Sequence, residues 1–553
     1  MVALDVVMII ALLGAYVTQM LRWLRVLQRE HYEARAMSRF LGRWSSPQVS
    51  AVTKTSLRVQ LLDPAPRLAP LDDFVGAAPH ERTRWTPKAK RPHRRPISLS
   101  QVLVVVFGVA VIAKAPVAYV GVGALYGLTC PVGLSIRGRT SALAWTRRLV
   151  TISIVASVLA VAVSLLGIPA HQHWLPAVAV IWAVPVILDV TTRMLKPYED
   201  RRARSFVDQA TARLTRVHPR VVAITGSYGK TSTKNHLAAL LAGEGGVVAT
   251  PRSFNNRAGL SRAINENLAD GTRVFIAEMG TYGPGEIRAM CEWCVPEIAV
   301  VTAIGPVHLE RMKSLAVIEG AKFEVTEKAK VVIVNVDDPV LARWPQRASA
   351  AQRYRTAGSL NADASVRVRD DGDEWAIVVD GETLGRVAAI TSVQPTNLAC
   401  ALAVALELGT AAGQLVARTS SVGPVENRSN VLTAASGVIV IDDTFNANPQ
   451  SARSALDALS RVAAHGRRVV VTPGLIELGV EQYSENLVFA QRVAAARDEL
   501  MIVQRTNVLA LEAGYKGPVR RFNTRDEAVA WVRSSLVAGD GVLYLNDLPD
   551  HYP

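Results

Sequence analysis

The chain has 553 residues, with 62 Lys and Arg against 47 Asp and Glu, and half of its residues are hydrophobic. This length and apolar content exclude a disordered chain and a small disulfide-stapled scaffold, and they exceed a single domain. Four cysteines are too few for a disulfide framework and fit a reducing cytoplasm. For the Cys291-x-x-Cys294 pair, helix packing and a metal or redox site are both open. Residues 22–100 hold sixteen Lys and Arg and six Asp and Glu, which is ten of the fifteen net positive charges.

The long apolar segments lie in the first 200 residues. Residues 3–21 are long enough to span a membrane, and a cluster of arginines follows them. No small-residue cleavage site follows, which favours an anchor over a signal peptide. Because positive charge between apolar segments marks the cytoplasmic side, we expect a multi-pass cell-membrane protein with the basic loop 22–100 and the later domains in the cytoplasm. This placement favours a membrane, and not nucleic acid, as the partner of the basic loop. Further apolar runs cover 101–135, 149–169 and 174–190.

The apolar segment 101–135 has Lys114-Ala115-Pro116 in its middle. Its flanking loops are both basic, so we expect it to cross the membrane an even number of times. A charge and a helix break inside a bilayer are costly unless the chain turns back there. We therefore predict a tight hairpin or a re-entrant segment, and the alternative is a single tilted helix with Lys114 reaching the interface. The proline-rich basic loop either contacts anionic lipid or is a solvated linker.

Residues 220–240 predict a strand, a glycine-rich loop and a helix in succession. The loop Gly226–Thr231 is one residue shorter than a Walker A motif, but it offers backbone N–H groups and a helix N-terminus to phosphate in the same way. We expect Lys230 to neutralise the β- and γ-phosphates of ATP and the Thr231 hydroxyl to reach Mg²⁺. A glycine turn with an exposed lysine is the alternative. The predicted ATP-binding residues here are Thr225, Gly226, Ser227, Tyr228, Gly229, Lys230, Thr231 and Ser232.

The sequence T-G-S-Y-G-K-T-S-T at 225–233 resembles the ATP loop of the Mur ligase family, whose enzymes join amino acids to cell-wall precursors. The resemblance continues in order over residues from about 205 to 485. Asn255 and Asn256 match the family's Asn-Asn segment, which implies substrate and phosphate contacts. Glu278 ends an apolar strand beside the phosphate loop. A carboxylate there is placed to hold a cation, so we predict that Glu278 is a Mg²⁺ ligand.

Two further segments complete the predicted metal site. Val307-His308-Leu309-Glu310 is similar to the family's His-Leu segment, whose His helps to bind a second Mg²⁺. Ala321-Lys322-Phe323-Glu324 matches the position at which the family's lysine carries a CO₂-derived carbamate. The resemblance therefore implies ATP with two Mg²⁺ ions and a carbamate on Lys322. The predicted metal-binding residues are Thr231, Glu278, His308 and Lys322, and the predicted catalytic residues are Lys230, His308, Lys322 and Arg428.

A second α/β domain is expected after the ATP-binding one. Residues 353–390 are polar and strand-like, and the Asn397 that follows matches the last Asn of the family's His-Asn-x-x-Asn nucleotide pattern. From about 413, short β runs alternate with helical patterns, which is typical of a doubly wound, Rossmann-like domain. We predict an α-helical membrane domain over 1–200, a P-loop ATPase-like parallel-sheet domain over 205–412, and a doubly wound domain over 413–553. The expected C-terminal strands are 437–442, 467–472, 499–503, 519–522 and 541–546, with helices near 450–464, 483–497 and 525–537.

The C-terminal motifs come at the carboxyl ends of predicted strands, where such sheets bind ligands. D-D-T-F-N-A-N-P at 442–449 resembles the family's Asp-Asp-Ser-Tyr-Asn-Ala-Asn-Pro. The resemblance implies nucleotide or phosphate contacts from Arg428 and Asp443, and substrate contacts from Asn446 and Asn448. The sequence departs from the family pattern at several places. Val393 and Gln394 stand where the family has His-Asn, and Asn427 stands where it has Gly. Gly474 stands where the family has Asp, and Leu545-Asn546-Asp547 stands where it usually has Lys-Gly-Ser.

The resemblance implies an ATP-dependent ligase that forms an amide bond through an acyl phosphate, in peptidoglycan-type precursor synthesis. Several motifs resemble the branch that adds D-alanyl-D-alanine, but a membrane segment stands in place of that branch's UDP-sugar-binding domain. We therefore expect a lipid-linked acceptor, or a growing polymer as in the related poly-γ-glutamate synthases, and an amino acid or peptide as the amine. A transporter motor is disfavoured because the sequence shows no Walker B Asp and no signature motif. A degenerate ligase domain that acts as a membrane scaffold is the remaining alternative.

Overall fold

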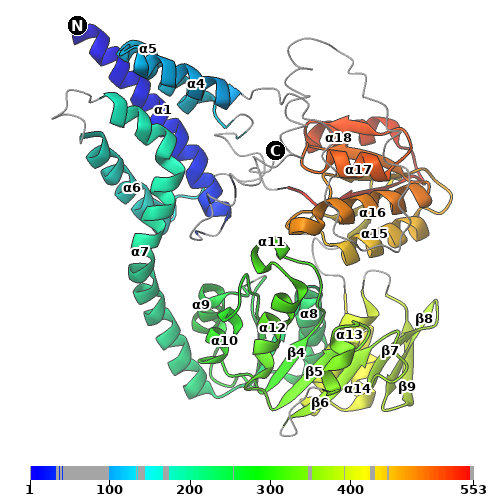
Figure 1. The fold of residues 1–553 in the computed structure, drawn as a ribbon. Helices are drawn as coiled ribbons and strands as arrows, with labels where there is room; N and C mark the ends of the chain where they lie inside the picture. Colours follow the sequence, from blue (N-terminus) through cyan, green and yellow to red (C-terminus); the bar gives the residue numbers. More distant parts are fainter. Residues whose placement is uncertain are drawn as a thin grey trace. The chain divides into compact units, whose positions relative to one another are not determined.

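A computed structural model describes most of the chain (Figure 1). The described residues are 2–30, 32, 37, 40, 99–131, 134, 143–165, 174–252, 254–346, 352–390, 393–423, 430–444 and 447–548. Most of the basic loop 22–100 and the predicted site residues Arg428 and Asn446 lie outside them. The chain divides into two compact units, Met1–Pro197 with Leu548–Pro553, and Tyr198–Asp547.

The first unit is helical. Its described helices are α1 (Val2–Arg29), α4 (Leu99–Ile112), α5 (Pro116–Thr129), α6 (Arg147–Leu165) and the start of α7 (Trp174–Val217). By length and composition, three helical stretches are apolar enough to cross a membrane, namely Ala3–Arg29, Arg147–Leu165 and Trp174–Val217. Large apolar side chains such as Val7, Ile10 and Val158 are exposed on these helices. A helix of a protein in water normally buries its large apolar side chains against a core, so it seldom exposes them in this way.

The apolar segment 101–135 folds into two helices, α4 and α5, of 14 residues each. Lys114 lies between them with φ 51°, a left-handed conformation that turns the chain. The predicted break at Lys114 is therefore confirmed, and the alternative of a single tilted helix is not observed. A 14-residue helix is about 21 Å long, which is shorter than the roughly 30 Å of a bilayer's apolar core.

Small residues let α5 pack closely against α1 and α7. A Cβ on Gly127 would lie 2.6 Å from the Ala15 Cβ, and one on Gly123 would lie 2.4 Å from Val178 Cγ1. Glycines four residues apart commonly permit such close helix packing. The carboxyl end of α5 is satisfied by Arg22, whose guanidinium donates to the carbonyl oxygens of Gly127, Leu128 and Cys130.

Helix α7 runs over 44 residues, across the domain boundary that we predicted near residue 200. Its last turns bury Ala210 and Leu214 in the core of the central α/β domain. This continuity cannot be predicted from the sequence, because the apolar pattern ends at Val190 and a charged pattern replaces it. The boundary between membrane-type and water-exposed sequence thus falls inside one helix.

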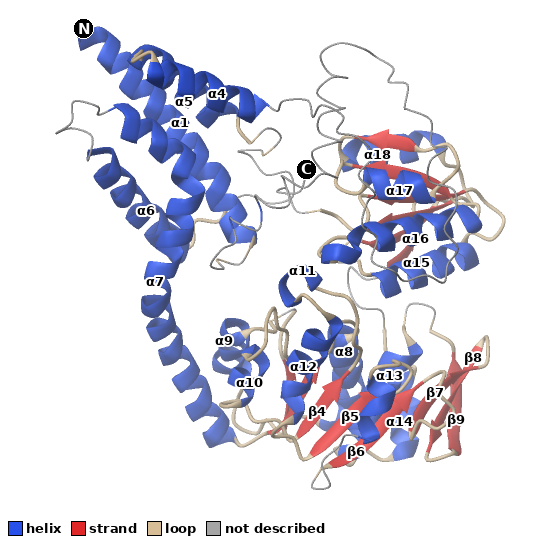
Figure 2. Ribbon diagram, in the orientation of Figure 1, coloured by secondary structure: helices blue, strands red, loops and turns tan. Residues whose placement is uncertain are grey.

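The central domain contains a nine-stranded sheet in the order β2-β3-β1-β4-β5-β6-β7-β8-β9 (Figure 2). The sheet is parallel from β2 to β7, as predicted, and β8 and β9 continue it in antiparallel fashion. The strands are β1 (Arg220–Thr225), β2 (Val247–Ala249), β3 (Val274–Glu278), β4 (Ile298–Val301), β5 (Val331–Asn335), β6 (Arg353–Gly358), β7 (Val366–Asp370), β8 (Glu374–Val379) and β9 (Glu382–Ala388).

Two cores cover the two faces of this sheet, because alternate strand residues point to opposite sides. Val221 belongs to the first core and Val222 to the second. The second core also includes Leu415 and Val422, so the central domain extends beyond the boundary predicted at 412. Helices that contribute to the first core include α9 (Arg257–Asn267), α10 (Glu286–Cys291), α11 (Leu309–Met312) and α12 (Leu315–Phe323). Those of the second are α8 (Lys230–Leu241), α13 (Pro395–Glu407) and α14 (Ala412–Thr419).

The Cys-x-x-Cys pair lies at the end of α10. Cys291 and Cys294 are buried and form no disulfide. Both belong to the first core, and burial raises the pKa of the Cys291 thiol to about 12. Buried thiols with raised pKa values are unreactive. The packing alternative therefore describes this pair.

The C-terminal domain has a six-stranded sheet in the order β10-β11-β15-β12-β13-β14, in which only the edge strand β10 is antiparallel. The predicted strands and helices are present within about three residues, while β10 and α17 were not predicted. The strands are β10 (Asn430–Thr433), β11 (Ile439–Asp443), β12 (Arg468–Thr472), β13 (Glu499–Val503), β14 (Arg520–Phe522) and β15 (Gly541–Leu545). The helices are α15 (Pro449–Val462), α16 (Gln482–Ala495), α17 (Val508–Gly514) and α18 (Arg525–Ser535).

Candidate active site

The phosphate loop joins β1 to α8 and requires glycine at two places. Gly226 has φ 149° and Gly229 has φ 80°, which L side chains rarely adopt. A Cβ on Gly226 would lie 2.1 Å from Thr302 Oγ1, and one on Gly229 would lie 2.3 Å from Asn397 Oδ1. The backbone N–H groups that precede α8 therefore lie in a tight turn, which is the arrangement that binds phosphate.

Side chains of the loop hold it against the segment that follows β4. Ser227 N donates to Ala303 O at 2.7 Å, and Ser227 Oγ donates to Gly305 O at 3.1 Å. The Tyr228 ring packs on Gly305, and burial raises the pKa of its phenol. Thr225 is buried and its carbonyl accepts from Thr302. Of the predicted ATP contacts, Ser227 and Tyr228 thus fix the loop through their side chains, and Thr225 does so through its carbonyl.

Lys230 and Thr231 are the first residues of α8. Lys230 Nζ donates to Gly226 O at 2.7 Å, so the ammonium lies over the glycine turn. Thr231 Oγ1 donates to Glu278 Oε1 at 3.1 Å. Asn255 Nδ2 donates to the same oxygen, also at 3.1 Å. The structure therefore brings together the predicted metal residues Thr231 and Glu278 and the predicted substrate residue Asn255.

The residues at this edge fit a Mg²⁺ ion that arrives with a nucleotide. Thr231 and Glu278 offer hard oxygen donors, and Glu278 is 1% exposed. Within the described ranges, no group of three or more His, Cys, Asp or Glu side chains forms a ready metal cluster. Mg²⁺ commonly binds through one or two protein oxygens together with substrate phosphates and water. The oxygen atoms of Thr231 and Glu278 match this way of binding Mg²⁺.

His308 precedes α11 in a left-handed conformation with φ 52°. Its ring contacts Tyr282 edge-on, with 4.9 Å between centroids. His308 Nδ1 is hydrogen-bonded to Glu477 Oε2. A carboxylate only accepts hydrogen bonds, so Nδ1 is the donor in this bond, and Nε2 is the ring nitrogen that would bind a metal ion. The sequence does not predict this pair, because 169 residues separate His308 from Glu477.

Lys322 on α12 is 2% exposed. Burial is the largest cause that lowers its pKa well below the ordinary 10.5, and the charge of Lys230 lowers it further, while Glu286 acts in the opposite direction. A buried lysine of this kind favours the neutral amine. The neutral amine is the form that can attack CO₂.

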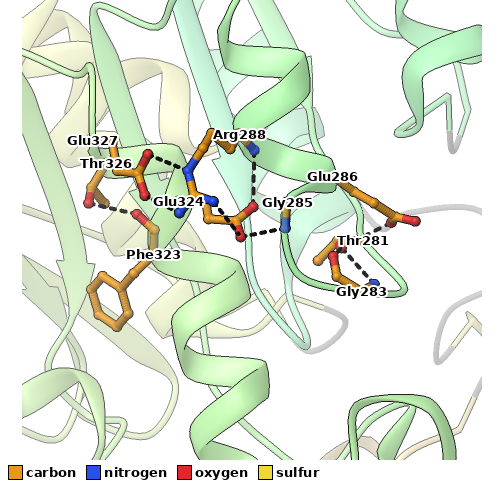
Figure 3. Close-up of polar contacts among 9 residues, drawn as sticks. All are labelled: Thr281, Gly283, Gly285, Glu286, Arg288, Phe323, Glu324, Thr326 and Glu327. Carbon is orange, nitrogen blue, oxygen red and sulfur yellow. Dashed lines mark hydrogen bonds and ion pairs between the residues drawn. The ribbon is translucent and has the colours of Figure 1, made fainter.

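Glu324, in the same Ala-Lys-Phe-Glu motif, is hydrogen-bonded to the start of α10 (Figure 3). Its carboxylate accepts from the backbone N–H of Gly285 at 2.6 Å and of Arg288 at 3.0 Å, at the start of α10. Glu286 in turn accepts from Tyr282 N at 2.8 Å. Through Glu324, the motif that carries Lys322 is therefore hydrogen-bonded to the segment that contacts His308.

Asn397 lies beside the phosphate loop because Asp337 holds its helix. Thr396 Oγ1 donates to Asp337 Oδ2 at 2.7 Å, and Ser359 N donates to the same oxygen at 2.6 Å. Asn397 Oδ1 then lies where a Gly229 side chain would be. The sequence does not predict the role of Asp337, because nothing in the surrounding pattern indicates a hydrogen bond to residue 396.

Two of the predicted substrate residues cap helices. Asn256 Oδ1 accepts from Gly259 N at 2.9 Å and caps α9. Asn448 Oδ1 accepts from Ser451 N at 2.9 Å and caps α15. Asp443 ends β11 and is buried. The side chains of these two asparagines therefore cap helices, in addition to the substrate contacts predicted for them.

Two of the departures from the family pattern, at Gly474 and Asn546, meet in the C-terminal domain. Asn546 Nδ2 donates to Gly474 O at 2.7 Å. Gly474 has φ 83°, and a Cβ there would lie 2.3 Å from Asn486 Oδ1. Asn507 Nδ2 donates to Leu475 O at 3.0 Å. The loop after β12 is therefore held by buried amides that sequence reasoning missed, since lone asparagines give no pattern.

The phosphate loop, the bonded pair Thr231 and Glu278, and the two α/β domains define a nucleotide-dependent ligase. The Mur ligase middle domain matches residues 224–405, and the Mur ligase glutamate ligase domain matches residues 427–545. The chain belongs to the Mur ligase family. The helical segment 1–197 lies outside both matched ranges.

Named relatives agree with this assignment. The UDP-N-acetylmuramoyl-tripeptide–D-alanyl-D-alanine ligase of Mycobacterium tuberculosis is 36% identical over 291 residues, which cover 48% of this chain and 54% of the relative. The ligase of the same name from Mycobacterium leprae is 32% identical over 366 residues, which cover 58% and 70%. The chain thus spans about half the length of the first of these relatives.

Solved structures show the same fold. The MurF ligase of Thermotoga maritima in complex with ADP aligns with a TM-score of 0.55 and 24% identity, over 62% of this chain and 80% of that chain. MurF from Acinetobacter baumannii aligns with a TM-score of 0.54 and 22% identity, over 62% and 77%.

Proposed function

We propose that this protein is an ATP-dependent ligase that joins an amine to a carboxylate, releases ADP and phosphate, and acts in peptidoglycan-type precursor synthesis at the membrane. The observation that carries the proposal is the meeting of Lys230, Thr231 and Glu278 at one phosphate loop. Family membership supplies the reaction class.

A carboxylate needs activation because its oxygen is a poor leaving group. In the proposed reaction the acceptor carboxylate takes the γ-phosphate of ATP, and the amine then displaces phosphate from the acyl phosphate. Lys230 neutralises the transferring phosphate, and the backbone N–H groups of Tyr228–Lys230 hold it in place. Thr231, Glu278 and His308 would hold two Mg²⁺ ions, which supply positive charge to the phosphates. Arg428 is proposed as a further phosphate cation.

A carbamate on Lys322 is part of the proposal. The low pKa of its buried amine supports attack of the nitrogen on CO₂, with loss of a proton. The product is a negatively charged carbamate in the place of a neutral amine. Such a group suits a metal site better than the amine does.

The acceptor is proposed to be lipid-linked. Support comes from three helical stretches apolar enough to span a membrane and from the position of both family matches after them. In this arrangement the protein is a multi-pass membrane protein with its ligase domains in the cytoplasm, and the amine is an amino acid or peptide. A poly-γ-glutamate-type polymer is the alternative acceptor.

Release of ADP by the full-length protein in detergent tests the function. We expect ADP release that depends on a lipid-linked acceptor, and Lys230→Ala should abolish it. Release with soluble UDP-muramyl peptide alone would contradict the lipid-linked acceptor. If cells that carry Lys230→Ala keep the wild-type phenotype, the protein acts as a membrane scaffold and not as a ligase.

A further inference from the structure

Lys234 lies one turn after Lys230 on α8 and is 2% exposed. Its ammonium lies 3.1 Å from Glu278 Oε2, and Glu278 itself is 1% exposed. Lys234 Nζ also donates to the carbonyl oxygen of Arg252. The predicted metal carboxylate therefore has a buried lysine as its ion-pair partner.

The two oxygens of Glu278 have different partners. Oε2 faces Lys234, whereas Oε1 accepts from Thr231 and Asn255. Residues 231 and 234 are three apart, so both side chains leave the same face of α8. A carboxylate held at one oxygen cannot rotate freely, and its second oxygen then points in a fixed direction. That direction is toward Thr231 and the phosphate loop.

The bond to Arg252 extends this arrangement to the loop that carries Asn255. Arg252 has φ 46°, a left-handed conformation that is uncommon for arginine. Three residues later Asn255 donates to Glu278, and its own carbonyl accepts from Gly280 N at 2.6 Å. Lys234 thus joins α8, the end of β3 and the loop before α9 at one ammonium group.

We propose that Lys234 is a positioning residue that holds Glu278 Oε2 and the Arg252 carbonyl, and thereby aims Glu278 Oε1 at the cation that accompanies the nucleotide. The inference rests on the proposed function, since it assigns Glu278 to that cation. Side chains that orient a metal ligand in this way commonly affect metal affinity by 10- to 100-fold when removed.

Two other accounts of Lys234 predict different results. If its charge merely competes with the metal for Glu278, then removal of the charge tightens metal binding. If Lys234 only stabilises the fold, its removal lowers the thermal midpoint and leaves metal affinity unchanged. The sign of the change in affinity therefore separates positioning from both accounts.

Binding of Mn²⁺ to the full-length protein in detergent, in the presence of ADP, tests the proposal without any ligation. The free Mn²⁺ signal in electron paramagnetic resonance gives the dissociation constant. We expect Lys234→Met to raise this constant by about 10- to 100-fold. Lys234→Gln, which keeps an N–H donor, serves if Lys234→Met does not fold, and it too should raise the constant. An unchanged or lower constant in a folded variant overturns the proposal.

Arg468→Met is the matched control for lost stability. Arg468 Nε lies 2.5 Å from Asp498 Oδ1 in the C-terminal sheet, and Asp498 is fully buried. This variant also breaks a buried ion pair, but it should leave the Mn²⁺ constant within about twofold of the wild-type value, since additivity holds for independent sites. A rise equal to that of Lys234→Met would mean that general destabilisation causes the effect, and would overturn the proposal.

A double variant tests whether Lys234 acts through Glu278. In the Glu278→Gln background, Lys234→Met should change the Mn²⁺ constant by less than about twofold, because its target is already removed. An equal loss in both backgrounds overturns the proposal. If no acceptor yields ADP release in the wild type while these binding results hold, the ligase function fails and the positioning role stands.

Discussion

The surroundings of two buried lysines in the central domain differ in what faces each ammonium group. Lys234 on α8 and Lys322 on α12 are each 2% exposed. Lys234 lies 3.1 Å from a carboxylate oxygen of Glu278. Lys322 has the positive charge of Lys230 among its neighbours, and its pKa lies well below the ordinary value, mainly through burial. Equal burial therefore gives the two side chains different chemistry, and the neighbouring charge makes the difference.

This difference matches the role proposed for each side chain. An ion-paired ammonium offers fixed charge and hydrogen-bond donors, which suit the orientation of Glu278 by Lys234. A neutral amine offers an electron pair, which suits the reaction of Lys322 with CO₂. Substitution of each lysine by methionine, which is similar in length, should therefore change stability in opposite directions.

Lys234→Met should give the largest change. It leaves the Glu278 carboxylate buried without its ion-pair partner, which typically costs about 3–5 kcal/mol. For a domain of this size, the thermal midpoint should fall on the order of 10 °C. Calorimetry of the full-length protein measures it. The double variant with Glu278→Gln should recover part of the loss, since no charge then stays unpaired, and a wild-type midpoint in Lys234→Met would contradict the comparison.

Lys322→Met should have a smaller effect of opposite sign. It replaces a buried amine that carries a desolvation cost with an apolar side chain, which should raise the free energy of unfolding by about 1–3 kcal/mol in CO₂-free buffer. The variant should also lose ligase activity if the carbamate is needed. Lys328→Met, at an exposed position, is the control and should stay within about 0.5 kcal/mol of the wild type. A lower midpoint in Lys322→Met than in Lys328→Met would rule this out.

The sequence was sufficient for features that depend on local pattern. Gly226 and Gly229 stand in a motif whose backbone conformation requires glycine, and the structure has positive φ at both. The alternation of strands and helices after 437 predicted five of the six strands of the C-terminal sheet, because each strand is a short apolar run with turn residues beside it. Lys114 and Pro116 predicted the break between α4 and α5, because a charge and a helix break are costly inside an apolar segment unless the chain turns there.

Features that depend on long-range pairing could not be predicted. The sequence around Lys234 does not distinguish it from other helical lysines. Its partner Glu278, at the end of β3, is 44 residues away in the chain. His308 and Glu477 lie on different domains, and Asn486 forms its hydrogen bonds with a loop that departs from the family pattern. Such contacts depend on the packed sheet order, in which neighbours are not consecutive in the chain.

The pH dependence of stability should give the smallest effect and the most direct evidence about Lys322. In the unfolded chain Lys322 titrates near 10.5, and in the folded chain its pKa is well below that value. Between the two values the unfolded chain binds more protons, so a rise in pH stabilises the folded wild type. The stability advantage of Lys322→Met should therefore shrink as the pH rises from 7 toward 10, by at most about 1.4 kcal/mol per pH unit.

Thermal midpoints of wild type, Lys322→Met and Lys328→Met in CO₂-free buffers between pH 7 and 9.5 check this slope. The difference between wild type and Lys328→Met should stay flat, while that between wild type and Lys322→Met narrows. Added bicarbonate should then raise the midpoint of the wild type alone, because a reaction that occurs only in the folded state stabilises it. An equal response of Lys322→Met would show that bicarbonate acts elsewhere and that the buried amine of Lys322 is not its target.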